Sequence, residues 1–145
     1  MFKININISK SKTLPSEFYT DSHIFKKVKN NIFEQSWQLI ICKKELVGLT
    51  SYPFIFFNGF LNENLLIANK DNEFRCLSNV CTHRGHIVSL CKSKSNILKC
   101  RYHGRTFKLN GNINKAPGFN GVKEFPTYTD NLTKIKIKEW NNFIF

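Results

Sequence analysis

Two short stretches of the sequence each place one cysteine close to one histidine. NVCTHRGHIVSL contains Cys81 and His83, and LKCRYHGRTFKL contains Cys100 and His103. Thiolate sulfur and imidazole nitrogen are both ligands of transition metals, so the two pairs provide a set of four donors. The alternative is a pair of core cysteines and two surface histidines, but near-matching stretches with a glycine close behind each histidine rarely arise by chance. The sequence therefore predicts a metal centre built by both stretches.

The division of the donors between the two stretches bears on the kind of metal. Zinc fingers of the common type take both cysteines from one half of the motif and both histidines from the other. Here each half supplies one of each, although a closed Cys₂His₂ zinc site stays open as an interpretation. A binuclear iron–sulfur centre explains the division directly, because one iron takes the two thiolates and the other takes the two imidazoles. This is the ligation of a Rieske [2Fe–2S] cluster.

Length and composition indicate one globular domain. The chain has 145 residues, of which 41% are hydrophobic and 14% are aromatic, and this is enough to bury a single core. Charges recur along the chain, so no segment is apolar enough to cross a membrane, and the N-terminus lacks the apolar centre of a secretory signal. We expect a cytoplasmic protein with no membrane partner. Its other cysteines, Cys42, Cys76 and Cys91, are expected to be reduced and to be small buried hydrophobes or bystanders.

The formal net charge of +12 raises the question of nucleic-acid binding. The lysines are spread along the chain and form no dense block, which favours a solvated basic surface that steers an acidic partner. We therefore expect no nucleic-acid partner. Arginine is much scarcer than lysine, and three of the four arginines, Arg84, Arg101 and Arg105, lie in the two Cys/His stretches. A rigid guanidinium with several donors suits hydrogen bonding at such a place.

The first part of the chain has a helical pattern. Within LPSEFYTDSHIFKKVKNNIFEQSW, Asp21 or Ser22 is the expected N-cap, and apolar residues fall on one face. We expect this stripe to pack on the body of the domain. The arm is assigned to residues 1–36.

The remainder, residues 37–145, has the character of a β domain. Short β-rich segments alternate with turn-forming residues: WQLII, FIFF, LLIA, EFRCL, ILKC, TFKL and TKIKIKEW. NKDN predicts a hairpin turn, and the pair Asn110-Gly111 predicts a two-residue hairpin. The expected fold is mostly β and antiparallel, with the helical arm at its N-terminus. Both Cys/His pairs fall on loops at strand ends, where a rigid scaffold presents a site.

The motif C-x-H-R-G followed by C-x-Y-H-G resembles the Rieske signature. With Arg84 and Tyr102 at their positions, the chain is similar to the N-terminal part of the alpha subunit of ring-hydroxylating (Rieske non-haem iron) oxygenases. The resemblance runs from Leu14 to Phe145. LPSEFYTDSHIFKKVKNNIFEQSWQLI resembles the family's N-terminal segment, and LKCRYHGRTFKLNGNINKAPGF resembles its second cluster loop and the hairpin after it.

This resemblance implies one Rieske-type [2Fe–2S] cluster, with a fold of the antiparallel Rieske iron–sulfur type. Cys81 and Cys100 would hold the buried iron, and His83 and His103 the outer one.

The residues next to the ligands also have implied roles. Backbone N–H groups of both loops, helped by Gly85 and Gly104, would donate hydrogen bonds to the bridging sulfides and tune the potential. Arg84 and Tyr102 are expected either to donate hydrogen bonds around the ligands or to pack the loops.

Two features depart from related patterns. Respiratory and photosynthetic Rieske proteins carry an extra cysteine in each loop, joined in a disulfide, whereas the candidate positions here hold His86 and Arg101-Tyr102. This favours the oxygenase or ferredoxin branch. In addition, Arg105 stands where many of the oxygenases have tryptophan, which leaves the packing over the second loop open.

The resemblance implies an electron-transfer domain that accepts electrons from a reductase or ferredoxin and passes them toward a mononuclear iron for O₂ activation. That iron needs two histidines and a carboxylate, but beyond the cluster only His23 and His86 remain, with no matching acid motif. We therefore expect no catalytic residue in these 145 positions and a truncated chain. The catalytic domain of the parent oxygenase would be a partner, and the resemblance implies a homotrimer for the intact protein. The alternative is a stand-alone Rieske-type ferredoxin, an electron carrier only.

Overall fold

A computed structural model describes residues 3–145 of the chain. It separates into two compact units that meet between Gln38 and Leu39, and each is described by itself. The expected fold class is confirmed, because the second unit consists of antiparallel strands and the first is helical. Within the described residues, no helix is both long and apolar enough to cross a membrane.

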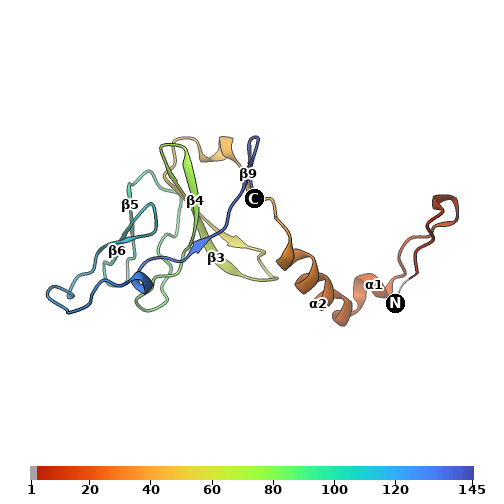
Figure 1. Ribbon diagram of the computed structural model, residues 1–145, viewed down its shortest axis with the longest axis horizontal. Coiled ribbons are helices and arrows are strands. Elements are labelled where there is room, and N and C mark those ends of the chain that lie inside the picture. Colours follow the sequence, from red (N-terminus) through yellow and green to blue (C-terminus); the bar gives the residue numbers. More distant parts are fainter. Residues whose placement is uncertain (1–2) are drawn as a thin grey trace. The chain divides into compact units, whose positions relative to one another are not determined.

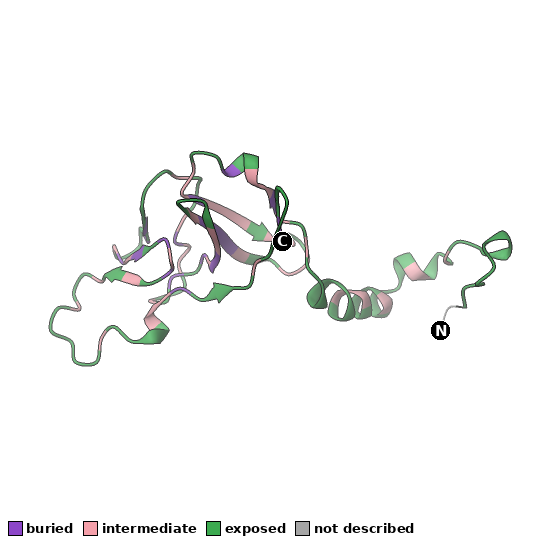
Figure 2. Cartoon of the chain, turned by 45° about the horizontal axis from the view of Figure 1, so that its top comes forward, coloured by how far each residue is buried: buried purple, intermediate pink, exposed green. Residues whose placement is uncertain are grey.

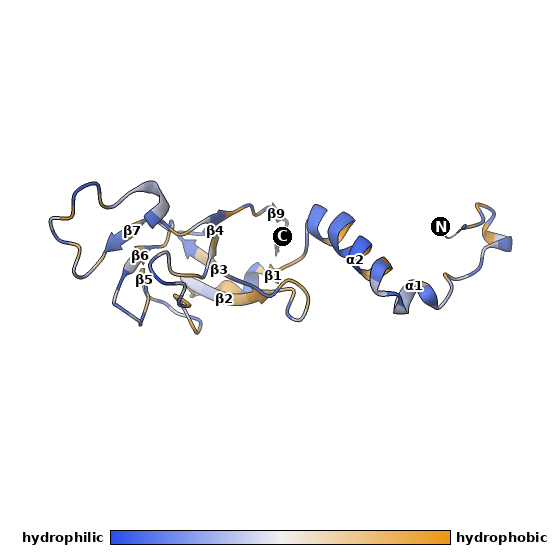
Figure 3. Ribbon diagram, turned by 90° about the horizontal axis from the view of Figure 1, so that it is seen from below, coloured by the Kyte–Doolittle hydropathy of each residue, from blue (hydrophilic) through white to orange (hydrophobic). Residues whose placement is uncertain are grey.

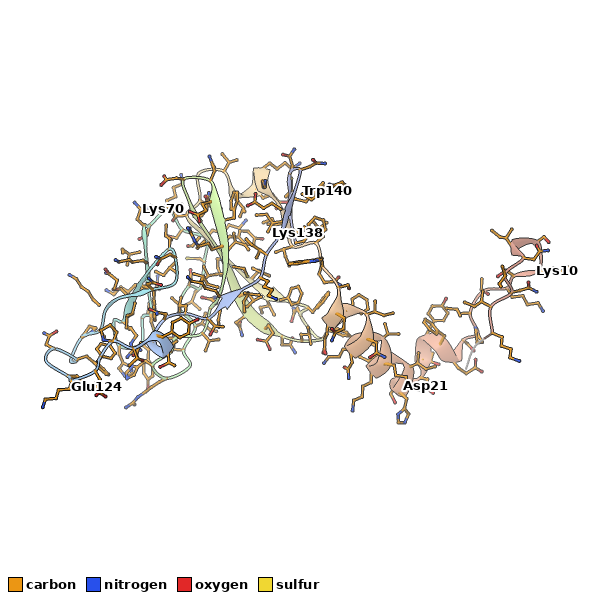
Figure 4. All side chains as sticks on the ribbon, viewed as in Figure 1. Lys10, Asp21, Lys70, Glu124, Lys138 and Trp140 are labelled. Atoms are coloured by element: carbon orange, nitrogen blue, oxygen red, sulfur yellow. The ribbon has the colours of Figure 1, made fainter. Side chains whose placement is uncertain are left out.

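The first unit contains two helices, α1 (Glu17–Thr20) and α2 (Ser22–Asn31). They are separate because Asp21 caps the second one: its Oδ1 accepts hydrogen bonds from the backbone N–H groups of His23 and Ile24, at 2.7 and 3.2 Å. Asp21 marks this start in Figure 4, and the expected cap is confirmed. Helix α2 has an apolar and a polar face (Figure 3), and none of its residues is buried (Figure 2). Packing of its apolar stripe on the body stays a prediction.

The centre of the second unit is a four-stranded sheet in the order β2-β3-β4-β8. The strands are Ser51–Phe56, Glu63–Lys70, Glu73–Ser78 and Lys134–Ile135. Strands β3 and β4 lie side by side in Figure 1, with Leu66 opposite Leu77 and Ile67 opposite Cys76.

Both faces of strand β3 are buried, so it organises two separate core clusters. Leu66 and Ala68 point into the cluster that contains Cys81 and Cys100, together with Leu77, Leu98 and Phe107. The alternate residues, Leu65 and Ile67, pack in a second cluster with Ile41 and Ile144. Successive side chains of a strand point to opposite faces, which explains this sorting. The face of the sheet that carries Leu66 and Ala68 therefore packs in the same cluster as the two cysteines.

Two three-stranded sheets complete the unit. One has the order β5-β6-β7, with strands Ile97–Lys99, Thr106–Lys108 and Ile113–Lys115. The other has the order β1-β10-β9, with strands Ile41–Cys42, Phe143–Ile144 and Glu139–Trp140.

Two expected strands differ from the structure. Of WQLII only Ile41 enters a strand, because β1 is as short as its partner β10. TKIKIKEW does not form one strand. Its start pairs with β4 as β8 and its end pairs with β10 as β9, so the chain changes sheets between them.

The structure has hairpin turns at both expected places, but the second is a longer loop over residues 109–112 and not the expected two-residue turn. Asp71 and Asn72 join β3 to β4 with φ values of +54° and +63°, which is the left-handed conformation that two-residue hairpins require. Lys70, at the end of β3, is labelled in Figure 4. Asn110 and Gly111 lie in the loop between β6 and β7, where Gly111 has φ +87°.

Gly111 allows a test of this packing. A Cβ atom there would lie 2.9 Å from Leu77 Cδ2 and 3.3 Å from the Leu132 carbonyl oxygen. Gly111→Ala should lower the free energy of unfolding by about 2–4 kcal/mol, since a left-handed conformation and overpacking add. Gly59→Ala is the matched control, because Gly59 has φ +79° and no atom within 4 Å of an added Cβ. This control should lower the free energy of unfolding by only about 1–2 kcal/mol. Urea titration of both variants measures the two losses. Equal losses would contradict the packing of Gly111 against the core.

Candidate metal centre

The two Cys/His loops have the same backbone turn. In the first loop, which follows β4, the Gly85 N–H donates to the Cys81 carbonyl oxygen at 3.0 Å and the Cys81 N–H donates to the His86 carbonyl oxygen at 2.8 Å. In the second loop, between β5 and β6, the Gly104 N–H donates to the Cys100 carbonyl oxygen at 3.1 Å. The Cys100 N–H completes the match by donating to the Arg105 carbonyl oxygen at 2.9 Å.

This shared turn explains the spacing of the motif. Each cysteine is followed four residues later by a glycine with a left-handed backbone, at φ +69° for Gly85 and +74° for Gly104. Such φ values are costly for residues with a Cβ. Cys-x-His and Cys-x-x-His therefore differ only in which residue of one turn carries the imidazole.

Each turn points its thiol inward and its imidazole outward. Cys81 and Cys100 are buried, at 3% and 2% exposure, and their thiols are close enough to hydrogen-bond. His83 is half-buried and His103 is exposed, and the two ring centroids are 4.9 Å apart. The structure thus brings together all four predicted donors, as a thiol pair and an imidazole pair.

The arrangement of the donors in two pairs bears on whether the centre holds one metal ion or two. Among residues 3–145, no three histidine, cysteine or acidic side chains are grouped as a site for one ion. A binuclear cluster asks only for two donors at each iron, and the two pairs fit that requirement.

The electrostatics of the two pairs also fit a cluster. Burial raises the pKa of the Cys81 thiol, and the adjacent Cys100 thiol contributes to the rise. The Cys81 thiol therefore stays neutral until a metal cation replaces its proton. Loss of solvation, followed by the positive charge of Arg105, lowers the pKa of His83. A neutral imidazole is the form that binds metal.

The first loop is held at its base by a buried amide. Asn79 is 3% exposed, and its side chain donates to the Ser89 carbonyl oxygen and accepts from the Ser89 N–H, both at 2.8 Å. These bonds close the loop that carries Cys81 and His83.

Aromatic rings surround the imidazole pair. The Tyr102 ring lies 3.8 Å from that of His103 and 5.6 Å from that of His86, and Phe119 contacts His83 edge-on at 5.8 Å. Arg84 is exposed on the first loop. Donation of hydrogen bonds to ligands by Arg84 or Tyr102 stays a prediction.

Sequence reasoning missed the interactions of Arg105. The residue is 3% exposed, and its Nη1 donates to Thr82 Oγ1 and to Asp130 Oδ1, both at 3.2 Å. Its guanidinium lies 5.3 and 5.4 Å from the ring centroids of Phe119 and Phe125. The available signals were the concentration of arginine in the Cys/His loops and the place of Arg105 at a position where the resemblance leads one to expect tryptophan.

The remaining cysteines and histidine lie on other elements. Cys76 is buried on β4, where burial raises the pKa of its thiol to about 12, Cys42 is partly buried and Cys91 is exposed. His23 lies on α2 of the first unit.

An antiparallel β unit that presents buried thiols and outward imidazoles on two matching turns defines a Rieske-type iron–sulfur domain. Residues 36–126 match the Rieske [2Fe-2S] domain family. The chain belongs to this family, whose cofactor is one Rieske-type [2Fe–2S] cluster.

Individual relatives lie among the oxygenases. The chain is 33% identical over 135 residues to the carnitine monooxygenase oxygenase subunit of Acinetobacter baumannii, and 31% identical over 141 residues to that of Escherichia coli K12. These alignments cover 92% and 96% of the chain, but only 36% and 37% of the relatives. The crystal structure of the quaternary ammonium Rieske monooxygenase CntA with L-carnitine superposes with a TM-score of 0.78 at 32% identity. That match covers 91% of this chain and 37% of the other. The chain thus spans little more than a third of these relatives.

Proposed function

We propose that this chain is the electron-transfer domain of a Rieske-type oxygenase alpha subunit. The observation that carries the proposal is the pair of matching turns, which bury two thiols and direct two imidazoles outward. In this assignment Cys81 and Cys100 hold the inner iron, and His83 and His103 hold the outer one. A bound Rieske cluster supplies reversible one-electron exchange.

The exposure of the imidazole pair indicates where on the surface this electron exchange takes place. His103 is exposed and His83 is half-buried, so electrons enter and leave by this edge while the thiol side stays in the core. The rings of Tyr102 and Phe119 flank this edge. The donor loses one electron for each electron that the domain accepts. The domain then passes that electron on to the catalytic partner.

The wider assembly is part of the same proposal. Residues 1–36 form an arm, residues 37–145 form the Rieske domain, and the catalytic iron belongs to a further domain of the parent protein. Similarity to oxygenase subunits of which the chain spans only 36–37% supports this division over a stand-alone ferredoxin. A homotrimeric assembly and a cytoplasmic location remain predictions from the sequence.

The charge pattern indicates the kind of donor. Residues 74–123, which include both loops, contain ten lysines and arginines and no aspartate or glutamate. Arg84 and Arg101 are exposed beside the two histidines. A reductase or ferredoxin with an acidic face would be steered toward this surface.

The cluster assignment predicts a spectrum. The purified chain should be red-brown, contain about two irons, and show a rhombic EPR signal with low average g after dithionite. Cys81→Ser and His103→Ala should each remove the visible absorption, since each deletes one iron ligand. Cys91→Ser is the matched control and should keep it, because Cys91 is exposed and outside the thiol pair. A colourless protein with stoichiometric zinc would overturn the assignment.

Charge steering predicts a salt-dependent rate. When an acidic plant-type ferredoxin is the reductant in stopped-flow mixing, the second-order rate constant should fall about tenfold between roughly 0.01 and 0.15 M salt. Arg84→Glu and Arg101→Glu should lower the rate at low salt. Lys70→Glu should change it little, because exposed Lys70 lies at the opposite end of the β3–β4 hairpin from the first loop. Equal effects of all three substitutions would argue against docking at the histidine edge.

A further inference from the structure

We propose that Arg105 is a positioning residue that ties the two cluster loops together and whose fixed positive charge raises the reduction potential of the cluster. The inference rests on the proposed function, because it needs the cluster to be held by these loops.

Arg105 connects three parts of the chain that are distant in sequence. Its backbone carbonyl oxygen accepts from the Cys100 N–H in the second loop. Its Nη1 donates to Thr82 Oγ1, and Thr82 stands between Cys81 and His83 in the first loop. One residue therefore contacts the backbone beside one thiol and the side chain between two donors of the other loop.

The third part is the segment that ends at Asp130. Asp130 Oδ1 accepts from Arg105, and the Asp130 carbonyl oxygen accepts from Thr82 Oγ1 at 2.7 Å. Its Oδ2 accepts from the N–H and the hydroxyl of Thr127, at 2.9 and 3.0 Å. Thr82, Arg105 and Asp130 thus form a closed hydrogen-bonded triangle, and Thr127 anchors it.

The two charges of this triangle are unequally shielded from water. The Arg105 side chain is 4% exposed, whereas that of Asp130 is 19% exposed. Water screens an exposed charge more than a buried one, so the carboxylate does not cancel the field of the guanidinium toward the loops. The guanidinium also contacts the first loop with its side chain, while the second carboxylate oxygen is turned to Thr127. The positive charge of Arg105 acts on both Cys81 and His83, and we infer from this arrangement that the net field at the donors is positive.

A positive field has a defined effect on an electron acceptor. Reduction adds one negative charge to the cluster, so a buried cation stabilises the reduced form and raises the potential. Arginine keeps its charge at any ordinary pH, so this contribution does not titrate away.

Packing alone is the competing role. The guanidinium lies against the Phe119 and Phe125 rings, and the two ring centroids are 4.6 Å apart. A neutral side chain of similar size could occupy this place, and then its charge would be irrelevant to the potential.

Redox titration of a set of variants separates the two roles. Arg105→Gln should lower the reduction potential, and Asp130→Asn should raise it by a smaller amount, because the two substitutions remove opposite charges. The double variant should lie between the single ones, and Arg105→Lys should stay close to the wild type. Lys108→Gln is the matched control. It removes an exposed charge three residues away and should leave the potential almost unchanged.

The outcomes are distinguishable from a failure of the proposed function. If the wild-type chain holds no cluster, the function itself fails. If it holds one, shifts of Arg105→Gln and Asp130→Asn in the same direction, or shifts no larger than that of Lys108→Gln, overturn the charge role. Should Arg105→Gln not fold, Asp130→Asn still decides, because an unchanged or lowered potential contradicts the inference.

Discussion

The thiols of Cys81 and Cys100 lie in the same apolar cluster as Leu66, Leu77 and Phe107, and much of the domain serves to keep them there. A buried thiolate is unfavourable unless a cation balances it, so burial raises the pKa of Cys81. The turn that follows each cysteine reverses the chain within four residues and places the imidazole at the surface. An inner thiol side and an outer imidazole edge are therefore properties of one local turn, used twice.

Local features of this kind could be predicted from the sequence. The Asp21 cap, the Asp71-Asn72 hairpin and the Cys/His spacing each depend on residues within a few positions of one another. The strand limits could not, because they depend on distant partners. Ile41 becomes a strand residue only where Ile144 lies beside it, and the TKIKIKEW segment divides because its two ends pair with different strands.

The surroundings of Arg105 show the same limit within the candidate site. Its two hydrogen-bonding partners are 23 and 25 residues away, and nothing in the pattern around Thr82 or Asp130 marks either one. Sequence reasoning could note that arginine replaces an expected tryptophan but could not say what the guanidinium would contact. Only the fold shows that the guanidinium lies against two phenylalanine rings.

The cations near the loops divide by solvent exposure into two kinds with different consequences. Arg84 and Arg101 are exposed, so salt screens them, and in the proposed function they act on how often a charged donor arrives. Arg105 is buried beside the turns, where screening is weak and a charge acts on the free energy of the reduced state itself. The sequence places arginines of both kinds within a few residues of the same donors. Burial, which the fold alone decides, separates the arginine proposed to act on the redox equilibrium from the arginines proposed to act on the encounter rate.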